Sequence, residues 1–141
     1  MKNDNAHISR LMNERFGHDC VIALATYDGD PHVRMVNGYY EDGCFYVITH
    51  ALSGKMKQIA VCPKAAVAGE WFTGHGVGEN LGCIKLTDNR ELWDRLYKIF
   101  GAWIDNDHTD LEDDNTVILR IRLTDGVLLS HGVRYEAEFP L

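Results

Sequence analysis

Alternating apolar and polar residues run through much of the chain and predict a protein built mainly from β-strands. The clearest alternation covers residues 116–124, with apolar Val117, Leu119, Ile121 and Leu123 and, between them, Arg120 and Arg122. Successive side chains of a strand point to opposite faces, so the aliphatic set faces a core and the arginines point away from it. Three interpretations of the two arginines stay open: free surface charge, a pair at a dimer interface, or a grip on an anionic substrate.

Further strands are predicted wherever a short apolar or alternating segment is bounded by turn residues. Asp28-Gly29, Asp42-Gly43 and Asp125-Gly126 are typical hairpin turns. The predicted strands cover residues 20–26, 32–39, 44–49, 64–72, 83–86, 116–124, 127–130 and 133–139. The first of them is apolar throughout, which favours a strand that is covered on both sides.

Three segments instead repeat their apolar residues at helical spacing. The first covers residues 5–16, the second opens at Ser53 and ends near Ala60, and the third covers residues 88–103 with the largest apolar face of the chain. The expected fold class is therefore mainly β with α. We predict a six- to eight-stranded antiparallel barrel with helices packed outside, in a single domain over residues 1–141.

Residues 73–82 contain four glycines in ten positions. The segment lacks the helix and the acidic residue that complete a dinucleotide-binding fingerprint. It is predicted to be a bulged or bent barrel strand, or its turn. The small residues of the preceding segment, 64–72, would let a planar ligand, a neighbouring strand or a second subunit lie close.

A candidate anion site arises where the second predicted strand, the third strand and the next helix come together. The Asp42-Gly43 turn folds the chain back, so that Arg34 on one strand meets Lys55 at the helix start. Thr49 and Ser53 add hydroxyl groups, and Ser53 as N-cap adds free backbone N–H groups at the positive end of the helix dipole. This set suits a phosphate dianion. The alternative is that Arg34 is an ordinary surface cation on an exposed strand face.

The same residues carry a resemblance to a known family. In chain order, the shared pieces are Arg34-Met35-Val36, Ile48-Thr49, Ser53-Gly54-Lys55, Gln58-Ile59, Pro63 and Trp71. Their order and spacing resemble the FMN-binding split β-barrel family of pyridoxamine 5′-phosphate oxidase and its relatives.

This resemblance implies bound FMN and a flavin-dependent oxidoreductase that acts on a small molecule. The implied cofactor-binding residues are Arg34, Met35, Val36, Asn37, Ile48, Thr49, Ser53, Lys55 and Trp71. Arg34, Ser53 and Lys55 would hold the phosphate, with Thr49 nearby. The backbone from Met35 to Asn37 would follow the edge of the isoalloxazine ring. The resemblance also implies a homodimer with flavin sites shared between the subunits.

Three differences separate this chain from the vitamin-processing oxidases of that family. Those enzymes usually carry arginine where this chain has Gly54, lysine where it has Tyr39, and a C-terminal substrate motif that is not found here. The resemblance therefore indicates a flavin reductase-like or nitro-reducing enzyme of the general-stress or nitroimidazole-resistance type. His75 and Glu79 would lie at the flavin or substrate edge, or in a solvent-exposed loop.

Composition and net charge narrow the classes of protein to which this chain could belong. A net charge of −7 argues against a nucleic-acid binder, because no excess of basic residues is present to displace counterions. The four cysteines show no metal-binding spacing, and the start of the sequence has no apolar run, so we expect a cytoplasmic protein with reduced thiols and no membrane span. The acidic residues 105–114 lack the spacing of a calcium loop and are predicted to form a solvated connection.

Two other functions stay open at this stage. A binding module would use the same groove for haem, a deazaflavin or another ligand without turning it over, with His75 or His50 as a candidate ligand. A structural or sensory dimer would use no ligand there.

Overall fold

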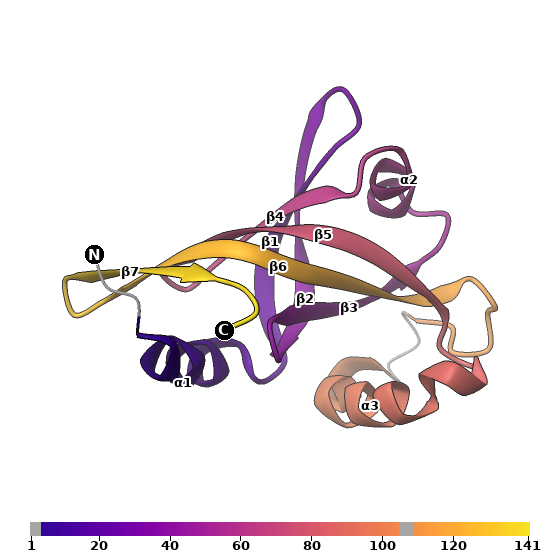
Figure 1. The fold of residues 1–141 in the computed structure, drawn as a ribbon. Coiled ribbons are helices and arrows are strands. Elements are labelled where there is room, and N and C mark those ends of the chain that lie inside the picture. Colours follow the sequence, from indigo (N-terminus) through magenta and orange to yellow (C-terminus); the bar gives the residue numbers. More distant parts are fainter. Residues whose placement is uncertain (1–3, 105–108) are drawn as a thin grey trace.

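Seven antiparallel strands dominate the computed structural model, which describes residues 4–104 and 109–141 (Figure 1). The strands are β1 (Cys20–Tyr27), β2 (Pro31–Glu41), β3 (Cys44–His50), β4 (Lys64–Gly69), β5 (Phe72–Cys83), β6 (Thr116–Ser130) and β7 (Val133–Glu138). The helices are α1 (Asn5–Phe16), α2 (Gly54–Val61) and α3 (Arg90–Ile104), with the short 3-10 turn η1 (Thr87–Asn89) before α3.

The sheet closes on itself. Its strand order is β3-β2-β1-β4-β5-β6-β7, and β3 pairs a second time, with β6. Six strands therefore form a barrel, and β7 extends the sheet beyond β6. The predicted antiparallel barrel with helices outside is confirmed. Among the helices of the described ranges, none has the length and apolarity needed to cross a membrane.

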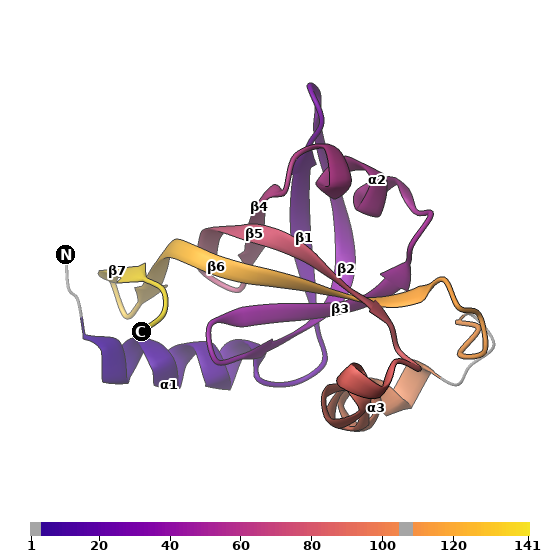
Figure 2. The ribbon, with the colours of Figure 1, turned by 45° about the vertical axis from the view of Figure 1, so that its right-hand side comes forward.

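Aromatic residues fill the barrel interior. Phe45 of β3 and Phe72 of β5 both meet Phe16 of α1, with ring centroids 5.4 and 5.8 Å apart. Helix α1 lies along one side of the barrel in both views (Figures 1 and 2) and buries the apolar face that the sequence predicts. Its buried residues are Ile8, Leu11, Met12 and Phe16.

Helix α3 covers a different part of the barrel exterior. Leu96, Phe100 and Ile104 pack against Tyr46 of β3 and Ile118 of β6, and all five side chains are buried. The start of β6 is therefore buried on both faces. Further along this strand, the predicted alternation is confirmed: the arginines at 120 and 122 point away from the interior.

Two turns differ from the sequence-based prediction. The hairpin turn predicted at Asp125-Gly126 is wrong, because β6 runs through both residues and the chain turns at His131-Gly132. A glycine is required inside the strand, since a Cβ at position 126 would lie 2.5 Å from the ring of Phe72. The single strand predicted over 64–72 breaks at Glu70-Trp71, which form the turn from β4 to β5.

The glycine-rich segment is a barrel strand, as predicted, although it ends at Cys83 rather than at Leu86. Its register shifts between His75 and Gly76 and again before Cys83. A Cβ at Gly78 would lie 3.0 Å from Ile59 of α2. The small residues of β5 therefore allow α2 to pack directly on the barrel wall.

Strand β1 is buried on one face only, so the predicted cover on both sides is wrong for the single chain. Leu24 and Thr26 point inward, whereas Val21 on the opposite face is 59% exposed. This outer apolar face continues onto β2, where Val33 and Met35 are 70% and 63% exposed. An extended apolar surface thus faces outward across β1 and β2.

Strands β2 and β3 diverge, and this opening positions the candidate site. They pair only over Tyr39–Glu41, at the closed end of their hairpin. Over residues 31–38, β2 pairs with β1 alone, so its other edge has no strand partner in the described chain. Figure 2 shows the two strands separating, with α2 and the connection that leads into it beside the opening.

Candidate functional site

Arg34 lies on the inward face of β2, at the open end of the barrel. Its guanidinium donates from Nη1 to Thr26 Oγ1 at 2.8 Å and to the carbonyl of Leu24 at 3.3 Å. Nη2 donates to Gln58 Oε1 of α2 at 2.6 Å. Arg34 therefore joins β1, β2 and α2, and the interpretation of an unengaged surface cation does not hold.

Lys55 lies in the first turn of α2, next to the end of β3. Its Nζ donates to Thr49 Oγ1 at 2.8 Å, and Thr49 Oγ1 lies 3.5 Å from Ser53 Oγ. Ser53 occupies the N-cap position, but its side chain makes no capping hydrogen bond. The Ser53 hydroxyl therefore stays beside the lysine instead of bonding to the helix backbone.

The two cations are close enough to influence each other. Burial lowers the pKa of Lys55, and the charge of Arg34 lowers it further. Burial also lowers the pKa of Arg34. Within residues 4–104 and 109–141, no carboxylate pairs with either side chain. Both positive groups are thus partly desolvated and bonded only to neutral oxygens, which is the condition that an incoming anion would relieve.

We call Arg34, Thr49, Ser53 and Lys55 the cation cluster. The sequence predicts all four residues, and the structure brings them together from β2, β3 and α2. Gln58 and Thr26, which bond to Arg34 and to each other at 2.5 Å, are absent from the predicted site. A signal exists for both: Gln58 lies three residues after Lys55 on α2, and Thr26 carries a hydroxyl on the inward face of an apolar strand.

The side chains of the other predicted residues of β2 point in different directions. Met35 points outward and is exposed, while Val36 packs against the barrel core. The Asn37 amide donates to Asp19 Oδ1 at 3.1 Å, so its side chain is already committed. What β2 offers here is its edge, where backbone N–H and C=O groups can meet the heteroatoms of a flat ligand.

The sequence matches no protein-family model and no curated protein. The fold is similar to that of a FAD-binding protein from Mesorhizobium loti, with a TM-score of 0.67, 18% identity, and 84% of this chain and 91% of that chain covered. A NimC/NimA family protein from Clostridium acetobutylicum gives a TM-score of 0.65 at 20% identity, covering 93% and 94% of the two chains. A haem binding protein from Mycobacterium smegmatis gives a TM-score of 0.70 at 14% identity, covering 98% of this chain and 59% of that one.

This chain shares its split-barrel fold with these proteins and with a putative pyridoxamine 5′-phosphate oxidase from Listeria innocua, which gives a TM-score of 0.64 at 14% identity and covers 89% of this chain and 97% of that chain. The fold that the sequence resemblance implies is thereby confirmed. In this split barrel, the cation cluster lies at the opening between β2 and β3.

Two predicted residues lie apart from the cation cluster. Ile48 packs into the apolar layer beneath α3. Trp71 lies in the β4–β5 turn, at the opposite end of β4 from α2, and is 70% exposed with a positive φ of 50°. Arg15 of α1 fixes this turn by donating to the carbonyls of Glu70 and Trp71, both at 3.3 Å.

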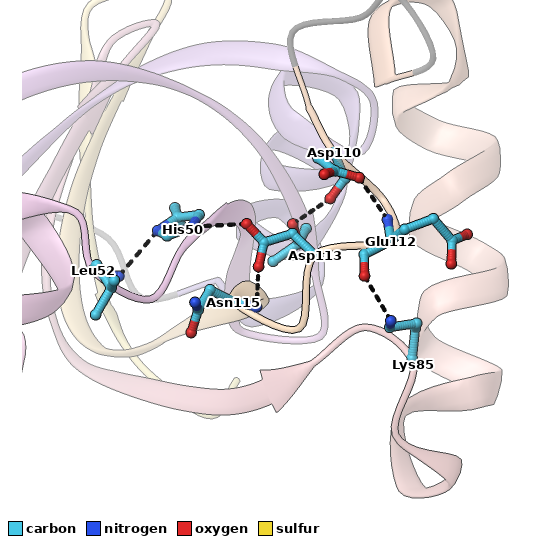
Figure 3. Close-up of polar contacts among 8 residues, drawn as sticks. His50, Leu52, Lys85, Asp110, Glu112, Asp113 and Asn115 are labelled. Atoms are coloured by element: carbon cyan, nitrogen blue, oxygen red, sulfur yellow. Dashed lines mark hydrogen bonds and ion pairs between the residues drawn. The ribbon is translucent and has the colours of Figure 1, made fainter.

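The two candidate histidines differ in how their rings are used. Both nitrogens of His50 are engaged, with Leu52 N–H at 3.2 Å and Asp113 Oδ2 at 3.1 Å (Figure 3). Among residues 4–104 and 109–141, His75 has a partner at Nδ1 alone, which lies 2.8 Å from Asp125 Oδ1. His75 lines a groove of about 250 Å³ with small residues of β1, β4 and β5, and its Nε2 remains available there.

Glu79 does not reach a ligand site of its own. Its carboxylate lies 3.2 Å from Arg120 Nε and 3.3 Å from Arg122 Nε, so it pairs with both predicted arginines at once. This pairing raises the pKa of Arg120. Elsewhere in the described ranges, no group of three or more potential metal ligands comes together. Residues 105–108 of the acidic segment lie outside the described residues.

Proposed function

We propose that the chain binds FMN and is a flavin-dependent oxidoreductase acting on a small molecule. One observation carries the proposal: two partly buried cations converge with two hydroxyls at a helix start, without a carboxylate among the described residues, beside an unpaired strand edge. Phosphate suits the cluster and a flat ring suits the edge. The fold similarity to a FAD-binding protein supports a flavin, and the phosphate-sized cluster favours FMN.

In this proposal each part of the chain has one task. Arg34 and Lys55 neutralise the phosphate, and Thr49 and Ser53 contribute hydroxyls to its oxygens. Gln58 holds the Arg34 guanidinium in place through the 2.6 Å bond to Nη2. The backbone from Met35 to Asn37 meets the polar edge of the ring. The flavin itself supplies the redox chemistry when bound, and the chain supplies placement and electrostatics.

The proposed substrate is small, and the enzyme is of the flavin reductase-like or nitro-reducing type that the sequence resemblance implies. The four cysteines are free thiols in the structure. Free thiols are typical of a reducing compartment, which supports a cytoplasmic location.

We also propose that a second copy of this chain covers the outer face of β1 and β2. Val21, Val33 and Met35 are more than half exposed on this face, and alanines of β1 and β4 form its floor. The same face adjoins the strand edge assigned to the ring, so a second copy seated here would complete the walls of the flavin site. The exposed Trp71 lies in the β4–β5 turn, where it is available to a second subunit.

Sedimentation equilibrium would test the dimer. Wild-type protein is expected at twice its chain mass, and a Val33→Glu, Met35→Glu variant at the mass of one chain, because burying two carboxylates in an apolar interface is unfavourable. His18→Glu, which adds a charge at an exposed position before β1, should leave the dimer intact. A dimeric double variant would contradict this assignment of the face.

The flavin is tested by purifying the protein and identifying its chromophore. We expect a yellow protein that releases FMN on denaturation, and bleaching of its absorbance by NADH or NADPH without oxygen. Protein that neither contains FMN nor takes it up from solution would overturn the proposal.

A haem-binding protein is the second candidate, because Asp125 orients the His75 ring beside an apolar groove and leaves Nε2 available. A carboxylate on the far ring nitrogen is the usual support of a histidine that ligates a metal. The fold similarity to a haem binding protein agrees with this candidate. A Soret band that His75→Ala removes, in protein without flavin, would favour it over the first.

A further inference from the structure

His50, the last residue of β3, uses both ring nitrogens in one arrangement (Figure 3). Nδ1 accepts from the backbone N–H of Leu52 at 3.2 Å, and Nε2 lies 3.1 Å from Asp113 Oδ2. An accepting Nδ1 carries no proton, so the neutral ring has its proton on Nε2 and donates it to Asp113. One tautomer therefore satisfies both contacts.

These contacts fix residues 50–52, the short connection between Thr49 and Ser53 of the cation cluster. Thr49 immediately precedes His50, and Ser53 follows three residues later, so residues 50–52 set the separation of the two hydroxyls. The N–H of Ser53 donates to the carbonyl of His50 at 3.0 Å, and the N–H of Ala51 donates to the carbonyl of Asn115 at 2.7 Å. The His50 ring adds a third link, from Leu52 to the loop that follows α3.

Asp113, the acceptor in this loop, is itself held in place. Its Oδ1 accepts from the N–H of Asn115 at 2.8 Å, and its carbonyl accepts from the N–H of Thr116 at 3.0 Å. The Asn115 N–H, together with His50, holds the pKa of Asp113 below its usual value. Because Thr116 begins β6, the carboxylate is anchored to the barrel and offers His50 a fixed partner.

We infer that His50 is a positioning residue for the phosphate subsite, acting through Asp113. The inference rests on the proposed function, since it requires that FMN phosphate binds at the cation cluster. Removing the His50 ring frees the N–H of Leu52 and lets residues 50–52 relax. Thr49 and Ser53 then lose their fixed separation, and ligating groups must be held to within about 0.5 Å to bind well. Contacts of β2 with the flavin ring, which the proposed function places along this strand, would be unaffected.

The test compares FMN with riboflavin, which lacks the phosphate, by titrating each into apoprotein and following flavin fluorescence. In His50→Ala we expect FMN to bind about tenfold more weakly, the low end of the scale seen at metal sites when a residue that supports a metal ligand is removed. Riboflavin should bind as it does to wild type. Asp113→Asn should weaken FMN in the same selective way, because one amide oxygen replaces two carboxylate acceptors.

His50→Asn separates the two contacts of the ring. An asparagine oxygen can accept from the N–H two residues later, which restores the bond to Leu52 but does not reach Asp113. We expect it to bind FMN with an affinity between those of wild type and His50→Ala. His18→Ala, at an exposed histidine in the turn between α1 and β1, is the matched control and should not change either affinity.

Two results would overturn the inference while leaving the proposed function intact. The first is an equal weakening of FMN and riboflavin in His50→Ala, which indicates a general loss of structure. The second is an unchanged FMN affinity in both His50→Ala and Asp113→Asn. Wild-type protein without FMN affinity would overturn the proposed function itself, and it is recognised before any variant is made.

Discussion

Two pairs of basic residues on this barrel differ in their partners: among the described residues, Arg120 and Arg122 have a carboxylate partner, and Arg34 and Lys55 have none. Arg120 and Arg122 share the carboxylate of Glu79, at 3.2 and 3.3 Å. Arg34 and Lys55 bond only to neutral oxygens of the described residues. The pKa of Arg120 is raised by its partner, whereas the pKa values of Arg34 and Lys55 are lowered by burial.

The difference separates a structural role for Arg120 and Arg122 from the ligand-binding role that we propose for Arg34 and Lys55. A guanidinium paired with a carboxylate gains from its neighbour and needs nothing further. A partly buried cation with neutral partners keeps its hydrogen bonds but not its charge compensation, so an anion from solution would stabilise it. Our proposal of an anion site therefore rests on the burial of Arg34 and Lys55 and on their neutral partners, and not on their basic character alone.

The largest expected effect comes from removing the uncompensated pair. Arg34→Ala combined with Lys55→Ala should weaken FMN binding a hundredfold or more, since each charged hydrogen bond contributes roughly 1.5–3 kcal/mol. Calorimetric titration of the apoprotein measures it. The matched control is Arg120→Ala with Arg122→Ala, which should bind FMN like wild type. Tight FMN binding in the first variant would contradict the assignment of the cation cluster.

The second prediction gives Arg34 a carboxylate partner, as Arg120 and Arg122 already have. Gln58→Glu places a carboxylate where Gln58 Oε1 now accepts from Arg34 at 2.6 Å, with almost no change in shape. FMN should bind about tenfold more weakly, because Arg34 is then neutralised and the phosphate is repelled. Unfolding in urea should show unliganded protein more stable by up to about 1 kcal/mol. An unchanged FMN affinity would show that Arg34 does not meet the phosphate.

The third prediction concerns protons. The folded chain lowers the pKa of Lys55 from its ordinary value of 10.5, so the unfolded chain binds more protons in the window just below 10.5. Stability from this group therefore rises with pH across that window. A bound phosphate favours the charged amine and raises its pKa again, so FMN binding at a pH within that window should take up protons.

Titrations in two buffers of different ionisation enthalpy would measure this uptake. Lys55→Met, which keeps a long apolar stem without the charge, should lose it. Equal uptake in wild type and Lys55→Met would assign the protons to another group.

The smallest effect is expected at Glu79, the partner of Arg120 and Arg122. Glu79→Gln should lower the free energy of unfolding by about 1 kcal/mol, because the pairs are partly exposed and each contributes little. Urea denaturation measures the loss. FMN affinity should stay within about twofold of wild type, since the neutral amide leaves the cation cluster untouched. A large loss of FMN affinity would show that the Glu79 ion pairs are coupled to the cation cluster.

Much of the fold follows from local pattern. The period-two alternation of 116–124 and the helical spacing of 5–16 each depend on one segment and one buried face, and both are confirmed. The predictions are wrong where contacts with residues distant in sequence determine the local structure or its burial. Asp125-Gly126 resembles a turn, yet the glycine is there because Phe72 packs against it. The apolar β1 resembles a strand buried on both sides, yet the described chain covers one.

The cation cluster divides in the same way. The sequence by itself determined that Arg34, Thr49, Ser53 and Lys55 would converge, because one hairpin and one helix start bring them together over a short length of chain. Only the tertiary structure decided that Gln58 and Thr26 hold the guanidinium, that Glu79 pairs with the other two arginines, and that Asp113 supports His50. These partners lie up to 63 residues apart in sequence. Closing the barrel sets which of them meet, and no local pattern records that choice.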